Sequence, residues 1–138
     1  MTYSITVQVG TYFSGNNVSA WIDFNRDGVF DNGTMTWAGV AGTSAYTGER
    51  LGYASLTALG QATWTFTVPA TGATPAPFQG STRLRVREWF AASATTMHPC
   101  TPGTWGECED FVVTIIPNCS ASFKLWLGNT NDWNNPAN

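Results

Sequence analysis

Oxygen-bearing side chains crowd into the stretch WIDFNRDGVFDNG, residues 21–33. Asp23, Asp27 and Asp31, three of the nine acidic residues in the chain, fall here with Asn25 between them. Carboxylates this close repel one another unless something neutralises them. The alternating spacing, followed by Gly28, fits the D-x-[DN]-x-[DN]-G calcium loop. Calcium takes about six to eight oxygen ligands, and alternate residues of a tight loop point at a common centre, so we expect this loop to bind calcium.

The loop lacks one expected ligand. Val29 would offer its backbone carbonyl, but the twelfth position, where such loops carry a bidentate glutamate, is Thr34. A second acidic cluster lies in the run GECED at residues 106–110. We expect this cluster to complete the site through Glu107, Glu109 and Asp110.

The alternative is a turn without a metal. Asparagine and aspartate side chains often bond nearby backbone amides, and the same residues would then form Asx turns. In that interpretation Glu109 or Asp110 pairs with Arg85 or Arg87. These arginines share one strand face with Arg83, and that face is either a solvated surface that resists edge-to-edge aggregation or a partner of the carboxylates.

Period-two alternation recurs along the chain and marks the elements that must position these residues. It is clearest in ATWTFTV, where alternate residues are threonine. Gly, Pro and Asn clusters separate the runs, and helical periodicity is nearly absent. The sequence predicts an all-β fold, an antiparallel β-sandwich of jelly-roll or immunoglobulin-like type with about seven to eight strands.

Composition narrows the class of protein. The 138 residues carry a net charge of −3 and a single lysine, with 43% hydrophobic residues. The absence of a basic patch argues against nucleic acid, and no apolar run approaches the roughly 20 residues of a membrane helix. We expect one domain over residues 1–117, and a linker with the beginning of a following module over 118–138.

Three motifs resemble a known family. WIDFNRDGVFD, TRLRVRE and GECEDFVVTI, in that order, resemble the GEVED domain of secreted and cell-surface bacterial proteins. The resemblance implies a β-sandwich module within a large secreted protein, and the tail LWLGNTNDWNNPAN looks like the start of a second secreted module. Here Cys108 replaces the family's valine, Phe111 its tyrosine, and Thr34 stands where the family usually has glutamate.

The three cysteines allow one intramolecular bridge. If 109–116 is an extended strand, Cys108 and Cys119 lie at its opposite ends, roughly 30 Å apart, which is too far for a disulfide. Cys100 and Cys108 flank a turn-rich loop, so we expect these two to be bridged. The alternative is three reduced thiols.

Aromatic side chains offer a different kind of site. Trp21 and Trp64 lie within strand patterns and are expected to pack against the sheets. The rings near strand ends or in loops could stack on sugars, and they are Trp37, Trp89 and Trp105. His98 has no second histidine for a zinc site, and no acid–base pair is evident, so we expect no catalysis.

Together these features predict a non-catalytic, calcium-stabilised module of a secreted or cell-surface bacterial protein. Its expected role is adhesion, or the spacing and presentation of neighbouring domains, with a cell-surface glycan or protein as a possible ligand. A carbohydrate-binding module of a secreted hydrolase is the second hypothesis, and a subunit of an extracellular filament is the third.

Overall fold

The part of the chain that the computed structural model describes contains eight strands. The described residues are 2–11, 14–33, 36–40, 43–68, 79–90, 92–103 and 105–116. Over 36–40 and 43–47 the backbone alone is described. The strands are β1 Thr2–Gln8, β2 Asn16–Ile22, β3 Thr36–Val40, β4 Thr43–Thr47, β5 Arg50–Leu56, β6 Gln61–Thr67, β7 Gly80–Phe90 and β8 Gly106–Ile115. The all-β prediction is therefore confirmed. No helix in these ranges is long and apolar enough to cross a membrane.

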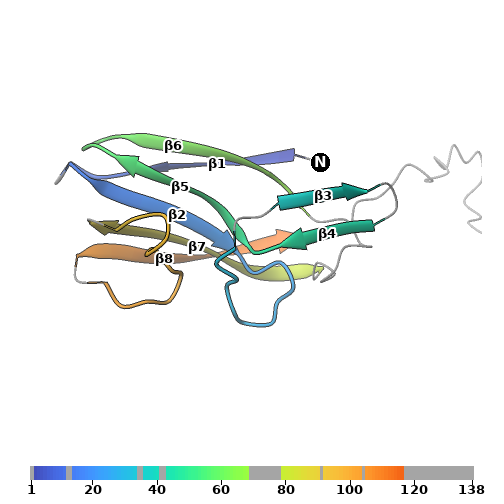
Figure 1. Ribbon diagram of the computed structural model, residues 1–138. Helices are drawn as coiled ribbons and strands as arrows, with labels where there is room; N and C mark the ends of the chain where they lie inside the picture. The colour runs from blue at the N-terminus through green and yellow to red at the C-terminus, as the bar shows by residue number, and fades with distance from the viewer. Residues whose placement is uncertain are drawn as a thin grey trace, which may run out of the picture.

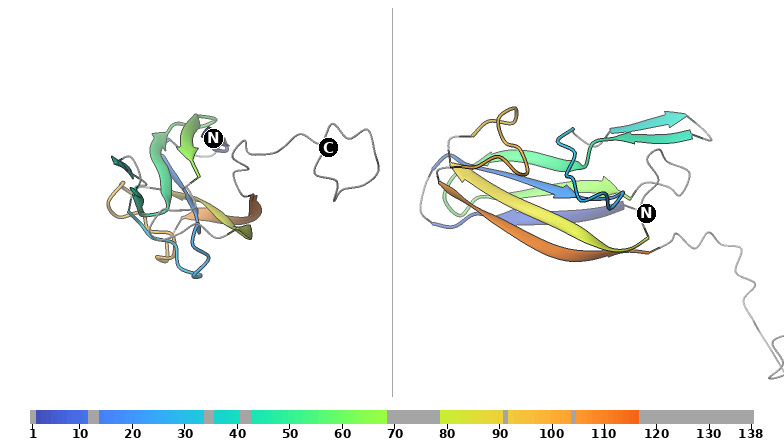
Figure 2. Two further views of the ribbon diagram at one scale, coloured as in Figure 1. Left: turned by 90° about the vertical axis from the view of Figure 1, so that its right-hand side faces the viewer. Right: turned by 90° about the horizontal axis from the view of Figure 1, so that it is seen from below.

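Two antiparallel sheets form a sandwich. One has the order β5-β2-β7-β8, the other consists of β1 and β6, and β3 with β4 makes a separate hairpin. The hairpin extends from one end of the sandwich, as Figure 1 and the right-hand view of Figure 2 show. Because β3 and β4 lie between β2 and β5 in the chain, this hairpin is an insertion between two strands that pair with each other.

The main core lies between the two sheets. Alternation along β2 turns Val18, Ala20 and Ile22 inward, where each is at most 4% exposed. From the other sheet, Trp64 packs against this core and lies directly over Gly52, where a Cβ atom would collide with the indole ring. The predicted inward placement of Trp64 is confirmed.

A second, smaller core covers the outer face of the four-stranded sheet. Trp21 and Phe30 are buried there together with Met97, which belongs to the segment of residues 92–103 that covers this face. Three arginines on this face donate to backbone carbonyls of that segment, in the pairs Arg50–Ala94, Arg85–Pro99 and Arg87–His98. Of the two interpretations of the arginine face, the solvated surface holds for Arg83 alone, because Arg87 is 7% exposed and Arg85 is half-buried. The alternative, pairing with a carboxylate of the GECED run, holds for Arg85, which pairs with Asp110.

The predicted linker and following module at 118–138 lie outside the described residues. The last strand, β8, ends at Ile115, and the described residues end at 116.

Candidate functional site

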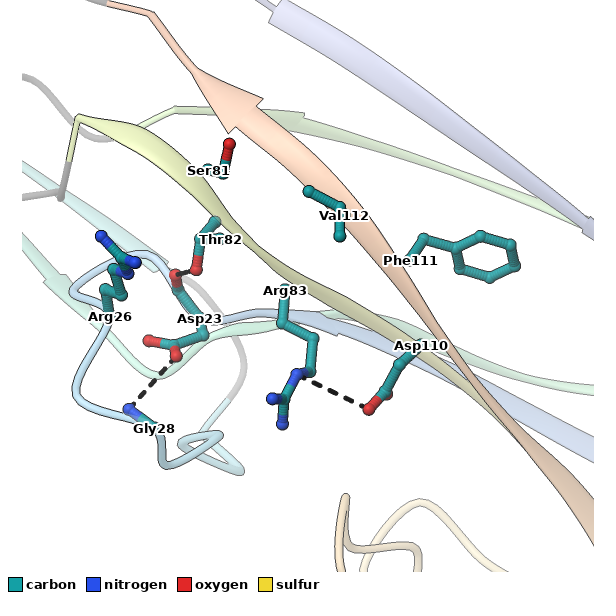
Figure 3. A pocket seen from close by; sticks show the side chains of 9 residues that line it. All are labelled: Asp23, Arg26, Gly28, Ser81, Thr82, Arg83, Asp110, Phe111 and Val112. Atoms are coloured by element: carbon teal, nitrogen blue, oxygen red, sulfur yellow. Dashed lines mark hydrogen bonds and ion pairs between the residues drawn. The ribbon is translucent and has the colours of Figure 1, made fainter.

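The acidic loop, residues 23–33, directly follows β2 and is hydrogen-bonded to β7. The backbone N–H of Asp23 donates to the carbonyl of Arg83 at 3.0 Å, and the hydroxyl of Thr82 donates to the carbonyl of Asp23. Gly28 has a φ of 84°, a conformation that glycine adopts without strain, and it turns the chain back toward the sheet. Its N–H donates to Asp23 Oδ2 at 3.2 Å, as Figure 3 shows.

Asn25 and Asp27 stabilise the loop with local hydrogen bonds. Asn25 Oδ1 accepts from the N–H of Asp27 at 3.1 Å, and Asp27 Oδ1 accepts from the N–H of Val29 at 2.8 Å. Asp27 Oδ2 also accepts from the side-chain amide of Asn25. These are the Asx-type contacts of the metal-free interpretation, and the structure shows them.

Glu49 sits at the centre of the loop, although the sequence analysis did not select it. Its side chain is fully buried. One carboxylate oxygen accepts from the N–H of Phe24 at 2.8 Å and the other from the N–H of Asp31 at 3.1 Å. Glu49 therefore joins the beginning and the end of the acidic loop.

Burial raises the pKa of Glu49 from its ordinary value of 4.5 to about 7. The nearby charge of Asp23 raises this pKa further, whereas the hydrogen bonds from the N–H groups of Asp31 and Phe24 lower it. Glu49 is thus buried beside Asp23, and the ionised form of Glu49 is costly there unless a cation is present.

The inserted hairpin explains why sequence analysis missed Glu49. The N–H of Glu49 donates to the carbonyl of Asp31, and the N–H of Arg50 donates to the carbonyl of Gly33, both at 3.1 Å. Gly48, with a φ of 73°, packs so closely on the Gly33 backbone that any Cβ there would collide with it. The chain therefore leaves the loop at Gly33, makes the hairpin, and returns to the same place. The one available signal was a glutamate directly before a strand in a charge-poor chain.

One buried side-chain oxygen in the loop has no hydrogen-bond partner. Asp23 is 6% exposed, and its Oδ1 is buried without a donor. An unsatisfied buried carboxylate oxygen is costly, and it calls for an explanation such as an ion. The donor set suits calcium, since ionised carboxylates keep lone pairs free even where each oxygen already accepts one N–H group.

The carboxylates of the GECED run do not converge on the loop. Asp110 forms a bidentate ion pair with Arg85, at 2.7 and 2.8 Å, and lies 3.6 Å from Arg83. Arg85 lowers the pKa of Asp110 through these hydrogen bonds. Glu109 pairs with Val86 in the β7–β8 register and so lies on the opposite face of β8 from Asp110, as does Glu107.

Asp23 and Asp110 nevertheless line the same open groove, of about 340 Å³. Figure 3 shows the Arg83 side chain between them. Among the residues that the structure describes, no three His, Cys, Asp or Glu side chains come together in an arrangement that holds a metal ion. The predicted meeting of both acidic clusters on a single ion is therefore absent, because arginines neutralise Asp110 and strand alternation separates Glu107 and Glu109 from it.

The predicted Cys100–Cys108 disulfide is also absent. Both thiols are free and exposed, and Cys100 Sγ accepts instead from Arg85 Nη1 at 3.4 Å. Cys108 lies on β8 opposite Arg87. The hydrogen bonds that Arg85 donates to Asp110 raise the pKa of the guanidinium above its ordinary value, against the opposing effect of burial. Cys119 lies outside the described residues.

The three tryptophans considered for sugar stacking differ in their surroundings. Trp105 is 66% exposed. Trp89 lies within β7 and packs against the smaller core of Trp21, Phe30 and Met97. The guanidinium of Arg87 lies 4.8 Å from its ring centroid. Trp37 lies in β3, where the structure describes only the backbone.

The chain combines a β-sandwich, an acidic loop after β2 and a Gly-Glu-x-Glu-Asp run that opens its last strand. The chain matches the GEVED domain over residues 17–114, which is more than half of its length. It therefore belongs to the GEVED domain family, whose members are domains of larger proteins. Comparisons with curated proteins and with solved structures found no match.

Proposed function

We propose that this chain is a non-catalytic module of a larger secreted or cell-surface protein and that calcium, bound in the acidic loop, stabilises it. The main support is the buried Asp23 Oδ1, which has no hydrogen-bond partner in a loop with the spacing of calcium ligands. The candidate ligands are Asp23, Asn25, Asp27, Asp31 and the carbonyl of Val29. Their acidic side chains would have to draw together around the ion, because no three of them converge in the described residues without it. A bound cation would supply the partner that Asp23 lacks.

The position of the loop suggests what the ion would do. The loop leaves β2, which lies between β5 and β7, and it contacts β7 through Asp23 and the start of β5 through Glu49. A cation there would fix the ends of three strands together. A module fixed in this way resists local opening and proteolysis, a property suited to adhesion or to the spacing and presentation of neighbouring domains.

Thermal unfolding with calcium and with a chelator tests the proposal. Extracellular sites of this type have Kd values of about 10⁻⁴–10⁻³ M. At about 10 mM calcium, mass action then stabilises the folded state by about 1.4–2.7 kcal/mol, which raises Tm by several degrees. Asp27→Ala should remove the shift. An unchanged Tm in the wild-type protein, at calcium up to ten times that concentration, would refute calcium stabilisation.

A carbohydrate-binding module is the second candidate, and the exposed ring of Trp105 favours it. Exposed tryptophan rings stack on sugar faces. Affinity electrophoresis on polysaccharide gels would reveal retardation that Trp105→Ala abolishes. Equal migration of the wild-type and variant proteins on every polysaccharide would remove this candidate.

A further inference from the structure

Two buried carboxylates from different parts of the chain lie at the acidic loop. The predicted ligand set included Asp23 but not Glu49. Asp23 comes from the end of β2 and Glu49 from the start of β5. Both side chains are more than nine-tenths buried. Asp110 differs from both, because it is exposed and forms ion pairs with Arg83 and Arg85.

Glu49 stands where the missing ligand is needed. Counting Asp23 as the first residue, the twelfth is Thr34, but the backbone leaves the loop at Gly33 and returns at Gly48. Glu49 follows that return, and its N–H bonds the carbonyl of Asp31, the ninth residue. In space, Glu49 therefore occupies the end of the loop that a twelfth residue occupies in an uninterrupted one.

The Glu49 carboxylate also has the capacity to bind a cation. Its oxygens accept backbone N–H groups from Phe24 and from Asp31, and a third backbone hydrogen bond comes from Asn25. An ionised carboxylate has about four acceptor positions, so one remains for a contact with a cation. The partnerless Oδ1 of Asp23 is the independent sign that an ion belongs beside it.

We propose that Glu49, and not the carboxylates of the GECED run, completes the calcium site, so that the ion closes the loop across the base of the inserted β3–β4 hairpin. This inference rests on the proposed calcium binding. It assigns the hairpin to the metal site, since both ends of the insertion, Gly33 and Gly48, adjoin the ligands. Calcium would then fix the hairpin to the sandwich at its base.

The test compares two glutamate-to-glutamine variants of the full chain. Glu49→Gln keeps the shape of the side chain but removes its charge, and Glu109→Gln removes the charge of an exposed glutamate from the GECED run. Thermal unfolding is measured for each with a chelator and with calcium chloride alone. We expect the calcium-induced rise in Tm to disappear in Glu49→Gln and to persist in Glu109→Gln at the wild-type value.

Each outcome decides between the two proposals. No rise in the wild-type protein defeats calcium binding itself, and the role of Glu49 with it. A wild-type rise that Glu49→Gln retains in full, or that Glu109→Gln loses, defeats only the assignment of Glu49. If Glu49→Gln does not fold, a crystal structure of the wild-type protein with calcium settles the matter. An ion within about 2.3–2.6 Å of the Glu49 oxygens supports the assignment, and an ion bound without Glu49 overturns it.

Discussion

Calcium-free protein should lose stability as the pH rises through the range in which Glu49 ionises. In the unfolded chain this side chain releases its proton near pH 4.5, whereas in the folded chain burial holds the pKa at about 7. Between these values the unfolded state binds fewer protons than the folded state, so the free energy of unfolding falls as the pH rises. It levels off above about pH 7, where both states are ionised, and the penalty is absent below pH 4.5, where both are protonated.

The size of the effect follows from the two pKa values. Each pKa unit corresponds to about 1.4 kcal/mol, so the difference between about 7 and 4.5 corresponds to about 3 kcal/mol. Other groups also titrate as the pH changes, among them Glu88, whose pKa is raised by burial and, to a smaller extent, by the charge of Glu107. The quantity to measure is therefore the difference between the wild-type protein and Glu49→Gln, in which these other groups are the same.

Urea unfolding at a series of pH values, followed by tryptophan fluorescence with a chelator present, measures this difference. Relative to Glu49→Gln, the wild-type free energy of unfolding should fall by about 3 kcal/mol between pH 4.5 and 7. Excess calcium should suppress the fall, because a cation favours the ionised carboxylate. If the free energy of unfolding of the wild-type protein relative to Glu49→Gln stays constant with pH, or rises, then burial does not raise the pKa of Glu49.

Two further predictions concern the core and the hairpin. Gly52→Ala should cost about 1–3 kcal/mol in the free energy of unfolding, because the new Cβ collides with Trp64. Gly10→Ala is the matched control, since a Cβ there meets nothing within 4 Å, and an equal loss in both variants would contradict the explanation. Deletion of residues 34–48 joins Gly33 to Glu49 and makes Glu49 the twelfth residue of the loop. The deleted protein should keep a calcium-induced rise in Tm, and a folded deletion variant with no such rise would contradict the role of Glu49.

Much of the fold could be predicted from the sequence because side-chain alternation is a local property of a strand. Ala62, Trp64 and Phe66 alternate with threonines, and the structure places them toward the core as that pattern requires. The outer face of the four-stranded sheet could not be predicted in the same way. Its arginines look like surface residues in the sequence, but Arg87 becomes buried when the segment 92–103 folds over the sheet.

The candidate site could likewise be predicted from the sequence only in part. The spacing of Asp23, Asn25 and Asp27 before Gly28 is contiguous in the chain, and these residues form a single loop in the structure. The choice of the remaining carboxylate depended on contacts between distant segments. Glu107, Glu109 and Asp110 were the more obvious candidates because they are clustered, but adjacent residues of a strand point to opposite faces.

The sequence by itself determined the β-sandwich, the membership in the GEVED domain family and the acidic loop, because each depends on residues that are neighbours along the chain or recur at a fixed spacing. Tertiary structure alone decided which acidic side chains are paired with arginines and which are buried beside one another. Arg83 and Arg85 neutralise Asp110 across two paired strands, whereas the return of the hairpin buries Glu49 beside Asp23. Burial and pairing depend on which distant segments meet, and only the folded chain brings these segments together.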